Sequence, residues 1–207
     1  MDGIYREMLA LIPPGANVLD LGCGLGLLGM LLAARGLGNE TYGIEWDPTK
    51  AHFAKSLAGQ AQSFQVVRGD LLSEPWPECS VIVLLDVLHY FRQDQQTALL
   101  IRTAEHLPEG GRLLLRVMDS EAKGVAAVTR FCERTAVGLG WNHASRVHWR
   151  PLEATRKDAR EAGFSILSLP GEAASSIGNR LLIAEKLSGS HWGRPRGFPI
   201  STKAPAE

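Results

Sequence analysis

The amino-acid sequence predicts one α/β domain in which helices cover both faces of a parallel sheet. Short apolar runs typical of strands alternate with helical stretches along most of the chain. The run Val81–Leu85 is apolar throughout, as expected for a strand that is buried on both faces. The length of 207 residues suits one sizeable domain and is too short for two ordinary ones.

The elements before this run can be placed from periodicity and from residues that begin or end helices. An opening helix has an apolar face that includes Ile4, Met8 and Ile12, and it ends at a Pro-Pro-Gly run. Gly36 ends a second helix and Pro48 begins a third, which are positions that these residues favour. We therefore expect strands at residues 17–21, 41–45 and 64–68, and helices at 4–12, 25–35 and 48–57.

The elements after Val81–Leu85 become less regular toward the C-terminus. A helix at 93–106 ends in a Pro-Glu-Gly-Gly turn, and a strand at 112–117 follows. Beyond it we expect a helix at 122–138, an irregular aromatic and histidine-rich stretch at 141–149, a helix at 151–162, and strands at 164–169 and 180–185. The domain thus spans 1–187, and the segment 188–207 lacks periodicity, which predicts a flexible tail.

Charge and cysteine usage argue against several functional classes. Lys and Arg number 22, as do Asp and Glu, so the chain has no bulk attraction to nucleic acid or to anionic membranes. Cys23, Cys79 and Cys132 are widely spaced and form no CxxC pair, which argues against a disulfide framework and a cysteine-rich zinc site. No apolar run approaches the ~20 residues of a membrane span, and no signal-peptide pattern is seen, so we expect a cytoplasmic protein.

A glycine-rich turn follows the first expected strand and is the clearest functional signal. Gly22, Gly24 and Gly26 alternate there, and glycine lets the backbone turn sharply and approach a ligand closely. The helix that follows presents free N–H groups and the positive end of its dipole. Glu45 ends the second strand, where a carboxylate can hold two ribose hydroxyls. This arrangement indicates a ligand that contains a nucleoside.

Two cofactor classes fit such a site. Residues 24–29 match the dinucleotide fingerprint GxGxxG, which alone is a weak signal for an NAD(P)-binding oxidoreductase. Asp20 lies two residues before the first glycine, where it would repel a diphosphate and attract the ammonium of a methionine moiety. Asp70, after the third strand, can accept a hydrogen bond from an adenine amino group. These features favour S-adenosylmethionine and leave the oxidoreductase as the alternative.

Taken together, four runs resemble the successive motifs of the class I S-adenosylmethionine-dependent methyltransferases. They are residues 20–26 (DLGCGLG), 43–45 (GIE), 69–71 (GDL) and 86–90 (DVLHY). The runs 109–113 and 162–164 resemble that superfamily's entries to its fifth and sixth strands. The resemblance covers residues 1–187. It implies a three-layer, Rossmann-like, doubly wound sheet of seven strands, mostly parallel, with the last strand antiparallel and inserted between the fifth and sixth.

The resemblance also implies which residues bind the cofactor. They follow the carboxyl ends of the expected strands and are Asp20, Gly22, Cys23, Gly24, Glu45, Trp46, Asp70, Leu71 and Asp86. The glycine turn would meet the methionine moiety, Glu45 the ribose and residues 70–71 the adenine, with Trp46 on the adenine or ribose edge. Two second readings stay open. Cys23 can simply fill space beside the turn, and Asp86 can hold the loop after the fourth strand.

Histidines mark the acceptor side and give the candidate catalytic residues. His89 and Tyr90 follow the fourth strand, where a histidine can act as general base or only pack beside the cofactor. His143 and His148 lie in the stretch 141–149, which in this superfamily's fold would lie over the methyl donor. A plain aromatic core cluster is the alternative reading. No carboxylate or cysteine accompanies the histidines at ligand spacing, so no metal site is expected.

The predicted acceptor is a small molecule. The Asn/Asp-Pro-Pro-Tyr/Phe element of adenine- and glutamine-amino methylators is absent after the fourth strand, and neither a paired-glutamate loop nor clustered acidic metal ligands are evident. The runs 85–90, 115–119 and 148–152 resemble methyltransferases of aryl-polyene and xanthomonadin-type pigment clusters. That narrower resemblance implies an aromatic acyl acceptor that a carrier protein can hold. A protein that binds the cofactor without chemistry remains the competing class.

Overall fold

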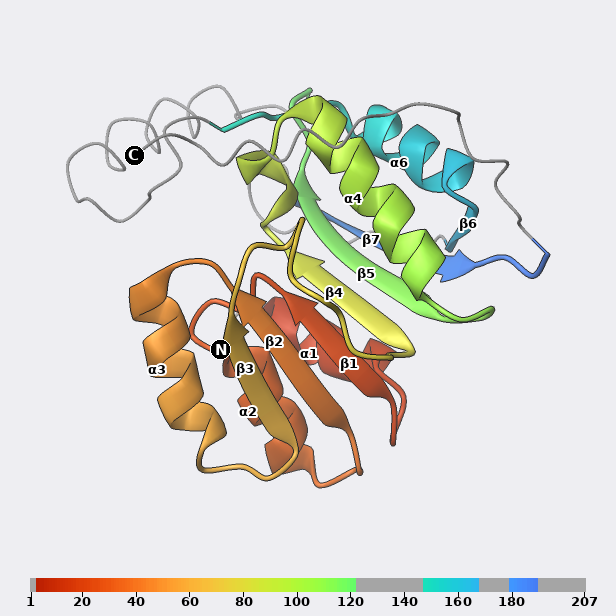
Figure 1. The fold of residues 1–207 in the computed structure, drawn as a ribbon. Helices are drawn as coiled ribbons and strands as arrows, with labels where there is room; N and C mark the ends of the chain where they lie inside the picture. The colour runs from red at the N-terminus through yellow and green to blue at the C-terminus, as the bar shows by residue number, and fades with distance from the viewer. Residues whose placement is uncertain (1–2, 122–146, 168–178, 190–207) are drawn as a thin grey trace.

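The computed structural model describes residues 3–121, 147–167 and 179–189, and its strands form one seven-stranded sheet. The strands are β1 (Asn17–Leu21), β2 (Glu40–Glu45), β3 (Phe64–Arg68), β4 (Val81–Leu85), β5 (Arg112–Met118), β6 (Phe164–Leu167) and β7 (Asn179–Lys186). Their order is β3-β2-β1-β4-β5-β7-β6, and β7 runs antiparallel to both neighbours while the other pairs are parallel (Figure 1). This confirms the predicted sheet with its antiparallel last strand.

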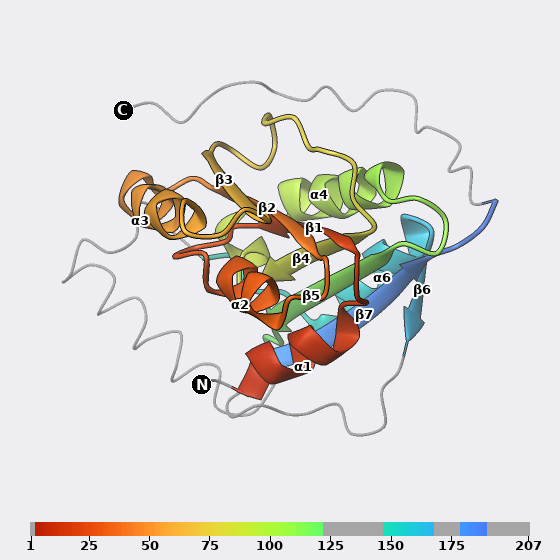
Figure 2. The same cartoon turned by 90° about the horizontal axis from the view of Figure 1, so that it is seen from below.

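Helices cover both faces of the sheet, which gives the expected three layers (Figures 1 and 2). One face carries α1 (Gly3–Leu11), α2 (Leu27–Arg35) and α3 (Pro48–Ala58), and the other carries α4 (Gln93–His106) and α6 (Leu152–Glu161). A short 3₁₀ turn, η1 (Leu88–Tyr90), follows β4. Periodicity did not predict this turn, because three residues are too few to show a helical pattern.

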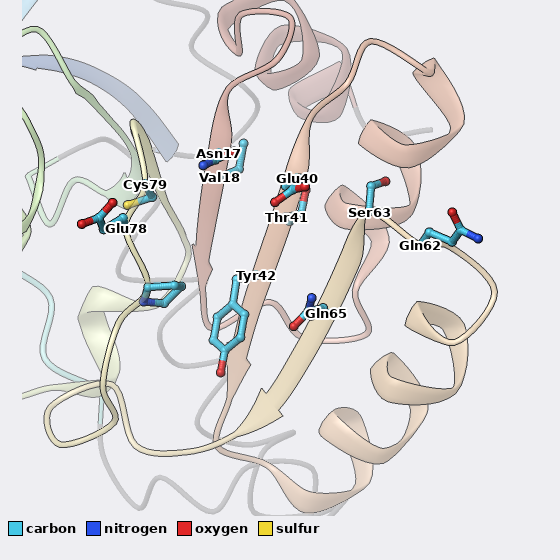
Figure 3. A pocket seen from close by; sticks show the side chains of 11 residues that line it. Asn17, Val18, Glu40, Thr41, Tyr42, Gln62, Ser63, Gln65, Glu78 and Cys79 are labelled. Carbon is cyan, nitrogen blue, oxygen red and sulfur yellow. The ribbon is translucent and has the colours of Figure 1, made fainter.

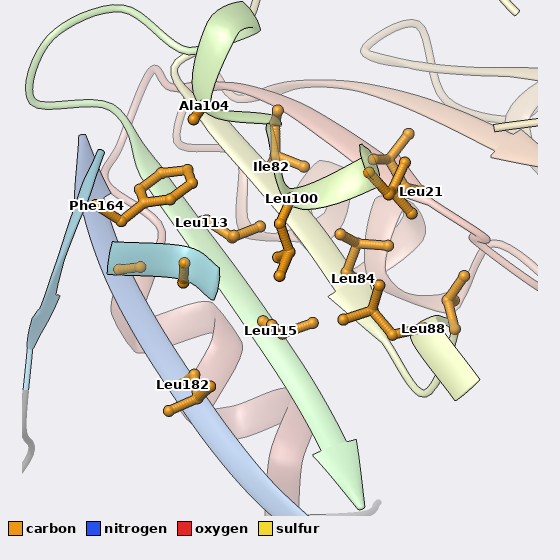
Figure 4. Packing of buried hydrophobic residues seen from close by; sticks show 14 of the residues in the cluster. Leu21, Ile82, Leu84, Leu88, Leu100, Ala104, Leu113, Leu115, Phe164 and Leu182 are labelled. Atoms are coloured by element: carbon orange, nitrogen blue, oxygen red, sulfur yellow. The ribbon is translucent and has the colours of Figure 1, made fainter. Parts of the chain in front are cut away.

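The two faces of the sheet bury two separate apolar clusters, because successive side chains of a strand point in opposite directions. Figure 4 shows Leu100 of α4 beside Ile82 and Leu84 of β4. Val83, between them in the sequence, belongs to the opposite cluster together with Leu28 of α2. A fully buried side chain of this size stabilises the fold by about 1.5–3 kcal/mol. The unbroken apolar run therefore places β4 at the centre of the sheet.

Most predicted boundaries within the described segments agree with the structure to within one or two residues. The helix expected from residue 25 begins at Leu27, because Gly26 adopts a left-handed φ of 79° and caps it. The expected helix at 122–138, residues 141–146 of the irregular stretch and the expected tail beyond residue 189 lie outside the described residues.

The topology places the predicted site at one edge of the sheet. Strands β2 and β3 are added on one side of β1, and β4 and β5 are added on the other. Sheets of this kind bind ligands outside the carboxyl ends of the strands, at the point where the order reverses. The glycine turn follows β1 and Asp86 follows β4, so both lie at this switch point.

Candidate functional site

Three glycines of the turn after β1 have left-handed backbone angles, but for different reasons. Gly22, Gly24 and Gly26 have φ values of 76°, 57° and 79°. A Cβ on Gly22 would meet Val87 Cγ2 at 2.5 Å, and one on Gly26 would meet the ring of Phe64 at 3.0 Å. Packing within the protein thus requires these two glycines. A Cβ on Gly24 would meet nothing within 4 Å, so this glycine leaves open space beside the turn.

The carboxylate of Glu45 links the turn to the end of β2. Its Oε2 accepts a hydrogen bond from the Gly24 N–H at 2.8 Å, and its Oε1 accepts one from the Asp47 N–H at 2.8 Å. The side chain is largely buried, with Glu45 only 9% exposed. Each carboxylate oxygen has a second lone-pair site. Glu45 can therefore hold the turn in shape and still accept hydrogen bonds from two hydroxyl groups.

Asp20 is a buried carboxylate near the carboxyl end of β1. It is 4% exposed, and within the described part of the chain no hydrogen bond stabilises its charged form. Burial, and to a lesser extent the negative charge of Glu45, raise the pKa of Asp20 to about 7. A cation beside this carboxylate would oppose both effects. The site therefore fits a ligand with a positive group, such as the ammonium of a methionine moiety.

Cys23 has the surroundings of a space-filling residue. Its thiol is buried, and burial raises its pKa. A Cβ on Gly43 of β2 would meet the Cys23 Sγ at 2.7 Å, so the sulfur occupies the place that a side chain on that strand would need. A buried thiol of this kind packs as a small apolar group. The predicted contact of Cys23 with the cofactor stays a prediction.

Further predicted residues follow the carboxyl ends of β2 and β3, on the same edge as the turn. Trp46 comes directly after β2 and is 50% exposed. Asp70 is exposed, and its Oδ1 accepts a hydrogen bond from the Leu72 N–H at 3.0 Å, while Leu71 between them is buried. The fold gathers these residues at the edge that carries Glu45. Their contacts with adenine stay predictions.

Asp86 is held by an ion pair at the end of β4. Its φ of 58° is unusual for a residue other than glycine. Both of its carboxylate oxygens lie 2.9 Å from Nε of Arg116 on the neighbouring strand β5, and Nη2 of Arg116 also contacts it. This pairing supports the reading in which Asp86 holds the loop before η1. Direct contact with the cofactor stays a prediction.

His89, Tyr90 and Trp149 form an aromatic cluster after β4. The ring centroid of His89 lies 4.2 Å from that of Tyr90 and 4.4 Å from that of Trp149. Burial lowers the pKa of His89 to about 4, although the negative charge of Asp86 opposes this. The imidazole is therefore neutral at pH 7, where it can accept a hydrogen bond but is a weak base.

Residues 147–150 are held beside the aromatic cluster by hydrogen bonds to backbone carbonyls. The His148 N–H donates to the carbonyl of His89 at 2.7 Å. Nε2 of Gln96, on α4, donates to the carbonyls of His148 and Phe91 at 2.8 and 2.9 Å. Gln96 is 1% exposed. It carries no signal in the sequence, because a glutamine in the polar first turns of a helix is ordinarily exposed.

The structure brings three of the four candidate catalytic residues to one place. His89 and His148 line the same small cavity, of about 10 Å³, and the ring of Tyr90 packs at a tilt against that of His89. His143 lies outside the described residues. Within residues 3–121, 147–167 and 179–189, no group of three or more His, Cys, Asp or Glu could hold a metal ion. The same segments contain no helix with the length and apolar character needed to cross a membrane.

A larger pocket, of about 240 Å³, lies at the opposite end of the sheet (Figure 3). Its lining includes Asn17 and Glu40, which are the first residues of β1 and β2. It also includes Ser63 and Cys79, which lie just before β3 and β4. It shares no residue with the glycine turn or the aromatic cluster. Because ligands of doubly wound sheets bind at the carboxyl ends of the strands, the glycine turn is the stronger candidate despite the larger size of this pocket.

Comparisons of sequence point to one family. The profile of a family described as a methyltransferase domain matches residues 1–169. The tRNA1(Val) (adenine(37)-N6)-methyltransferase of Aliivibrio salmonicida is 27% identical over 124 residues, which cover 58% of this chain and 47% of that protein. The carboxy-S-adenosyl-L-methionine synthase of Chromohalobacter salexigens is 29% identical over 126 residues, covering 56% and 46%. The chain thus spans about half the length of these curated relatives.

Solved structures share the fold at lower sequence identity. The YcgJ protein of Bacillus subtilis has a TM-score of 0.70 and 14% identity, over 91% of this chain and 100% of its own. Magnesium protoporphyrin IX methyltransferase of Synechocystis PCC 6803, solved with bound SAH, has a TM-score of 0.69 and 22% identity, over 89% and 81%. An O-methyltransferase family 2 protein of Planctomyces limnophilus has a TM-score of 0.68 and 22% identity, over 88% and 57%.

Proposed function

This chain belongs to the class I S-adenosylmethionine-dependent methyltransferases, and we propose that it transfers the cofactor's methyl group to a small-molecule acceptor. The observation that carries the proposal is the turn after β1, where Gly24 faces open space beside two buried carboxylates, Asp20 and Glu45. A dinucleotide would place its diphosphate at such a turn, where these carboxylates would repel it. The negative charge at the site therefore disfavours the oxidoreductase alternative, and so does membership of the methyltransferase family.

The residues around the turn suit the successive parts of the cofactor. Asp20 would pair with the ammonium of the methionine moiety, and the open side of Gly24 would admit that moiety close to the backbone. Glu45 would accept from the ribose hydroxyls with the lone pairs that its two backbone hydrogen bonds leave. The adenine would lie among Trp46, Asp70 and Leu71. When bound, the cofactor supplies a methyl group already activated by a sulfonium.

The chain's part in the chemistry is to align the acceptor and to exclude water, because methyl transfer is an in-line displacement. The aromatic cluster is placed for this role. Val87, two residues before His89, faces Gly22 so closely that a Cβ on that glycine would meet it at 2.5 Å. The cluster of His89, Tyr90 and Trp149 therefore adjoins the turn that would hold the methyl donor.

The proposed acceptor is a flat aromatic molecule with a hydroxyl or carboxyl group. Aromatic side chains bind flat apolar ligands well, and the neutral ring of His89 can accept a hydrogen bond from a hydroxyl. Nε1 of Trp149 is buried and has no hydrogen-bond partner among the residues that the structure describes. A buried unpaired donor costs about 1–3 kcal/mol, which an oxygen of the acceptor would offset. Attachment of the acceptor to a carrier protein, and the cytoplasmic location, stay predictions from the sequence.

Release of S-adenosylhomocysteine in the presence of candidate acceptors tests this proposal. The panel is a set of hydroxylated aromatic acids, each offered free and as a thioester on a carrier protein. We expect turnover with at least one form, and a comparison of metabolites in a deletion strain and its parent would then identify the natural acceptor. A chain that binds S-adenosylhomocysteine but methylates neither the panel nor any metabolite that the deletion reveals would be the non-catalytic binding protein instead.

A further inference from the structure

One face of α4 holds the segment between β3 and β4 at both of its ends. Arg102 and His106 are four residues apart on α4 and therefore lie on the same face. Nη1 of Arg102 donates to the carbonyl of Leu71, at the start of the segment, at 2.7 Å. Nε2 of His106 lies 2.7 Å from the carbonyl oxygen of Pro77, near its end. The segment that begins with Asp70 and Leu71 is thus tied to the helix layer.

Arg102 makes two more contacts with the same segment. Its Nη2 donates to the carbonyl of Glu74 at 2.6 Å, and its guanidinium carbon lies 4.0 Å from the centre of the Trp76 ring. The ring of His106 meets Trp76 edge-on, with 5.4 Å between centroids. One planar guanidinium therefore contacts the segment at three points. The single ammonium of a lysine cannot reproduce this geometry.

At its two ends the segment continues the sheet: the N–H of Gly69 donates to the carbonyl of Glu45 at 3.1 Å, and that of Ser80 donates to the carbonyl of Asn17 at 3.0 Å. Between these ends its remaining backbone hydrogen bonds are local. The carbonyl of Asp70 accepts from the N–H groups of Ser73 and Glu74 at 3.1 and 2.8 Å, and its Oδ1 accepts from the Leu72 N–H at 3.0 Å. These bonds shape a turn, but they do not fix where the turn lies on the sheet. The buried side chain of Leu71 anchors its start by packing. From Leu71 to Glu74 the long-range hydrogen bonds come from Arg102, and at Pro77 the contact comes from His106.

We propose that Arg102 is a positioning residue, which holds Asp70 and Leu71 in the places where they recognise the adenine of the cofactor. The inference rests on the proposed function, because the adenine contact belongs to it. Asp70 lies close enough to Arg102 to affect its ionisation: burial lowers the pKa of Arg102, and the charge of Asp70 opposes this. The two side chains are thus coupled by charge as well as through the backbone.

The test compares two ligands that differ only in the group Asp70 would recognise. S-adenosylhomocysteine carries the adenine amino group, and its 6-deamino analogue, in which the base is unsubstituted purine, carries a hydrogen there, which cannot donate a conventional hydrogen bond to a carboxylate. We expect the wild-type chain to prefer the first by about 10-fold, as for one lost hydrogen bond to a charged group. In Arg102→Lys the preference should fall to within about 2-fold. Arg160→Lys, on the exposed side of α6, is the control and should leave both affinities unchanged.

The outcomes separate this inference from the proposed function. A wild-type chain that binds neither ligand overturns both. A wild-type chain that binds both ligands equally, or an Arg102→Lys variant that weakens both by the same factor and keeps their ratio, overturns the positioning role alone. If circular dichroism shows that Arg102→Lys does not fold, Trp76→Leu replaces it. This variant keeps the carbonyl contacts of Arg102 and loses the stacked ring, so we expect a ratio between those of the wild type and unity, and an unchanged ratio counts against the proposal.

Discussion

The two halves of the proposed site are built in different ways. On the cofactor side the backbone forms the site: the turn depends on left-handed glycines, and Glu45 holds the N–H of Gly24. On the acceptor side the side chains form it: His89 stacks on Trp149, and Gln96 fastens the segment that carries His148. A site made by backbone conformation demands particular residues at fixed spacing. A site made by side chains from distant segments does not.

This difference sets the size and kind of effect that substitutions should have. A side chain added to the turn strains the backbone and also fills the ligand's place, so binding should suffer heavily. A side chain removed from the aromatic cluster leaves a backbone that other contacts still hold. Turnover should then fall while affinity for the cofactor remains.

Gly24→Val should reduce affinity for S-adenosylhomocysteine by about 100-fold or more, because the new side chain would fill the open side of the turn. The matched control is Gly36→Val, at the end of α2. Gly36 has a φ of 62° against 57° for Gly24, and a Cβ there also meets nothing within 4 Å. Both variants should lose about 1–2 kcal/mol of stability through backbone strain. Calorimetry that finds equal affinity in the two variants would show that the turn is not the cofactor site.

Asp20→Asn should stabilise the ligand-free protein while it weakens cofactor binding. The folded pKa of about 7 lies above the ordinary value of 3.8, so the folded state binds the extra proton between these pH values. Stability of the wild type should therefore fall as pH rises from about 4 to about 7. The variant lacks this loss and should be more stable by about 2–4 kcal/mol at pH 8. Urea unfolding at pH 5 and pH 8 measures both chains, and an equal pH dependence in the two would contradict the account.

Glu45→Gln should weaken S-adenosylhomocysteine binding by about 1.5–3 kcal/mol, as for a lost charged hydrogen bond. In the wild type the N–H groups of Gly24 and Asp47 each donate to one oxygen of the carboxylate. The NH₂ of the glutamine would face one of these N–H groups, and because two donors cannot pair, the turn itself should loosen. Glu40→Gln is the control, since Glu40 is exposed at the other end of β2. Calorimetry should find the control unchanged, and a Glu45→Gln variant that matches it would remove Glu45 from the site.

His148→Ala and His143→Ala should each lower turnover with the natural acceptor by about 10-fold, as for the loss of one hydrogen bond to the acceptor. Affinity for S-adenosylhomocysteine should stay within about 0.5 kcal/mol of the wild type, as for changes outside the contacts. His52→Ala, at an exposed position of α3, controls for loss of a histidine. Steady-state kinetics decide the question. Full turnover in both variants would mean that the stretch 141–149 only packs.

Much of the fold could be predicted because local patterns determine it. Strand β4 is apolar on both faces, and Gly36 and Pro48 mark helix ends that the structure confirms. The strand order came from the resemblance of the motifs, since periodicity alone does not order strands. On the cofactor side, the spacing of the turn and Glu45 could be read directly, because only glycine tolerates those φ values at little cost.

The rest depends on contacts between residues that are far apart in the sequence. The ion pair of Asp86 with Arg116 joins neighbouring strands, and the hold of Arg102 on the segment between β3 and β4 needs the helix layer to be in place. Gln96 of α4 bonds the carbonyl of His148, which lies beyond β5 in the sequence. No local pattern marks such residues. On the acceptor side the sequence therefore predicts individual residues, His89, Tyr90, His143 and His148, but not the contacts of Gln96 that hold the segment of His148 in place.

Calorimetric titration of the wild-type chain with S-adenosylhomocysteine, and in parallel with NADH, distinguishes the two cofactor classes. We expect binding of S-adenosylhomocysteine at one site per chain and no measurable binding of NADH, because the buried carboxylates at the turn favour an ammonium and repel a diphosphate. Tight binding of NADH without binding of S-adenosylhomocysteine would contradict this expectation.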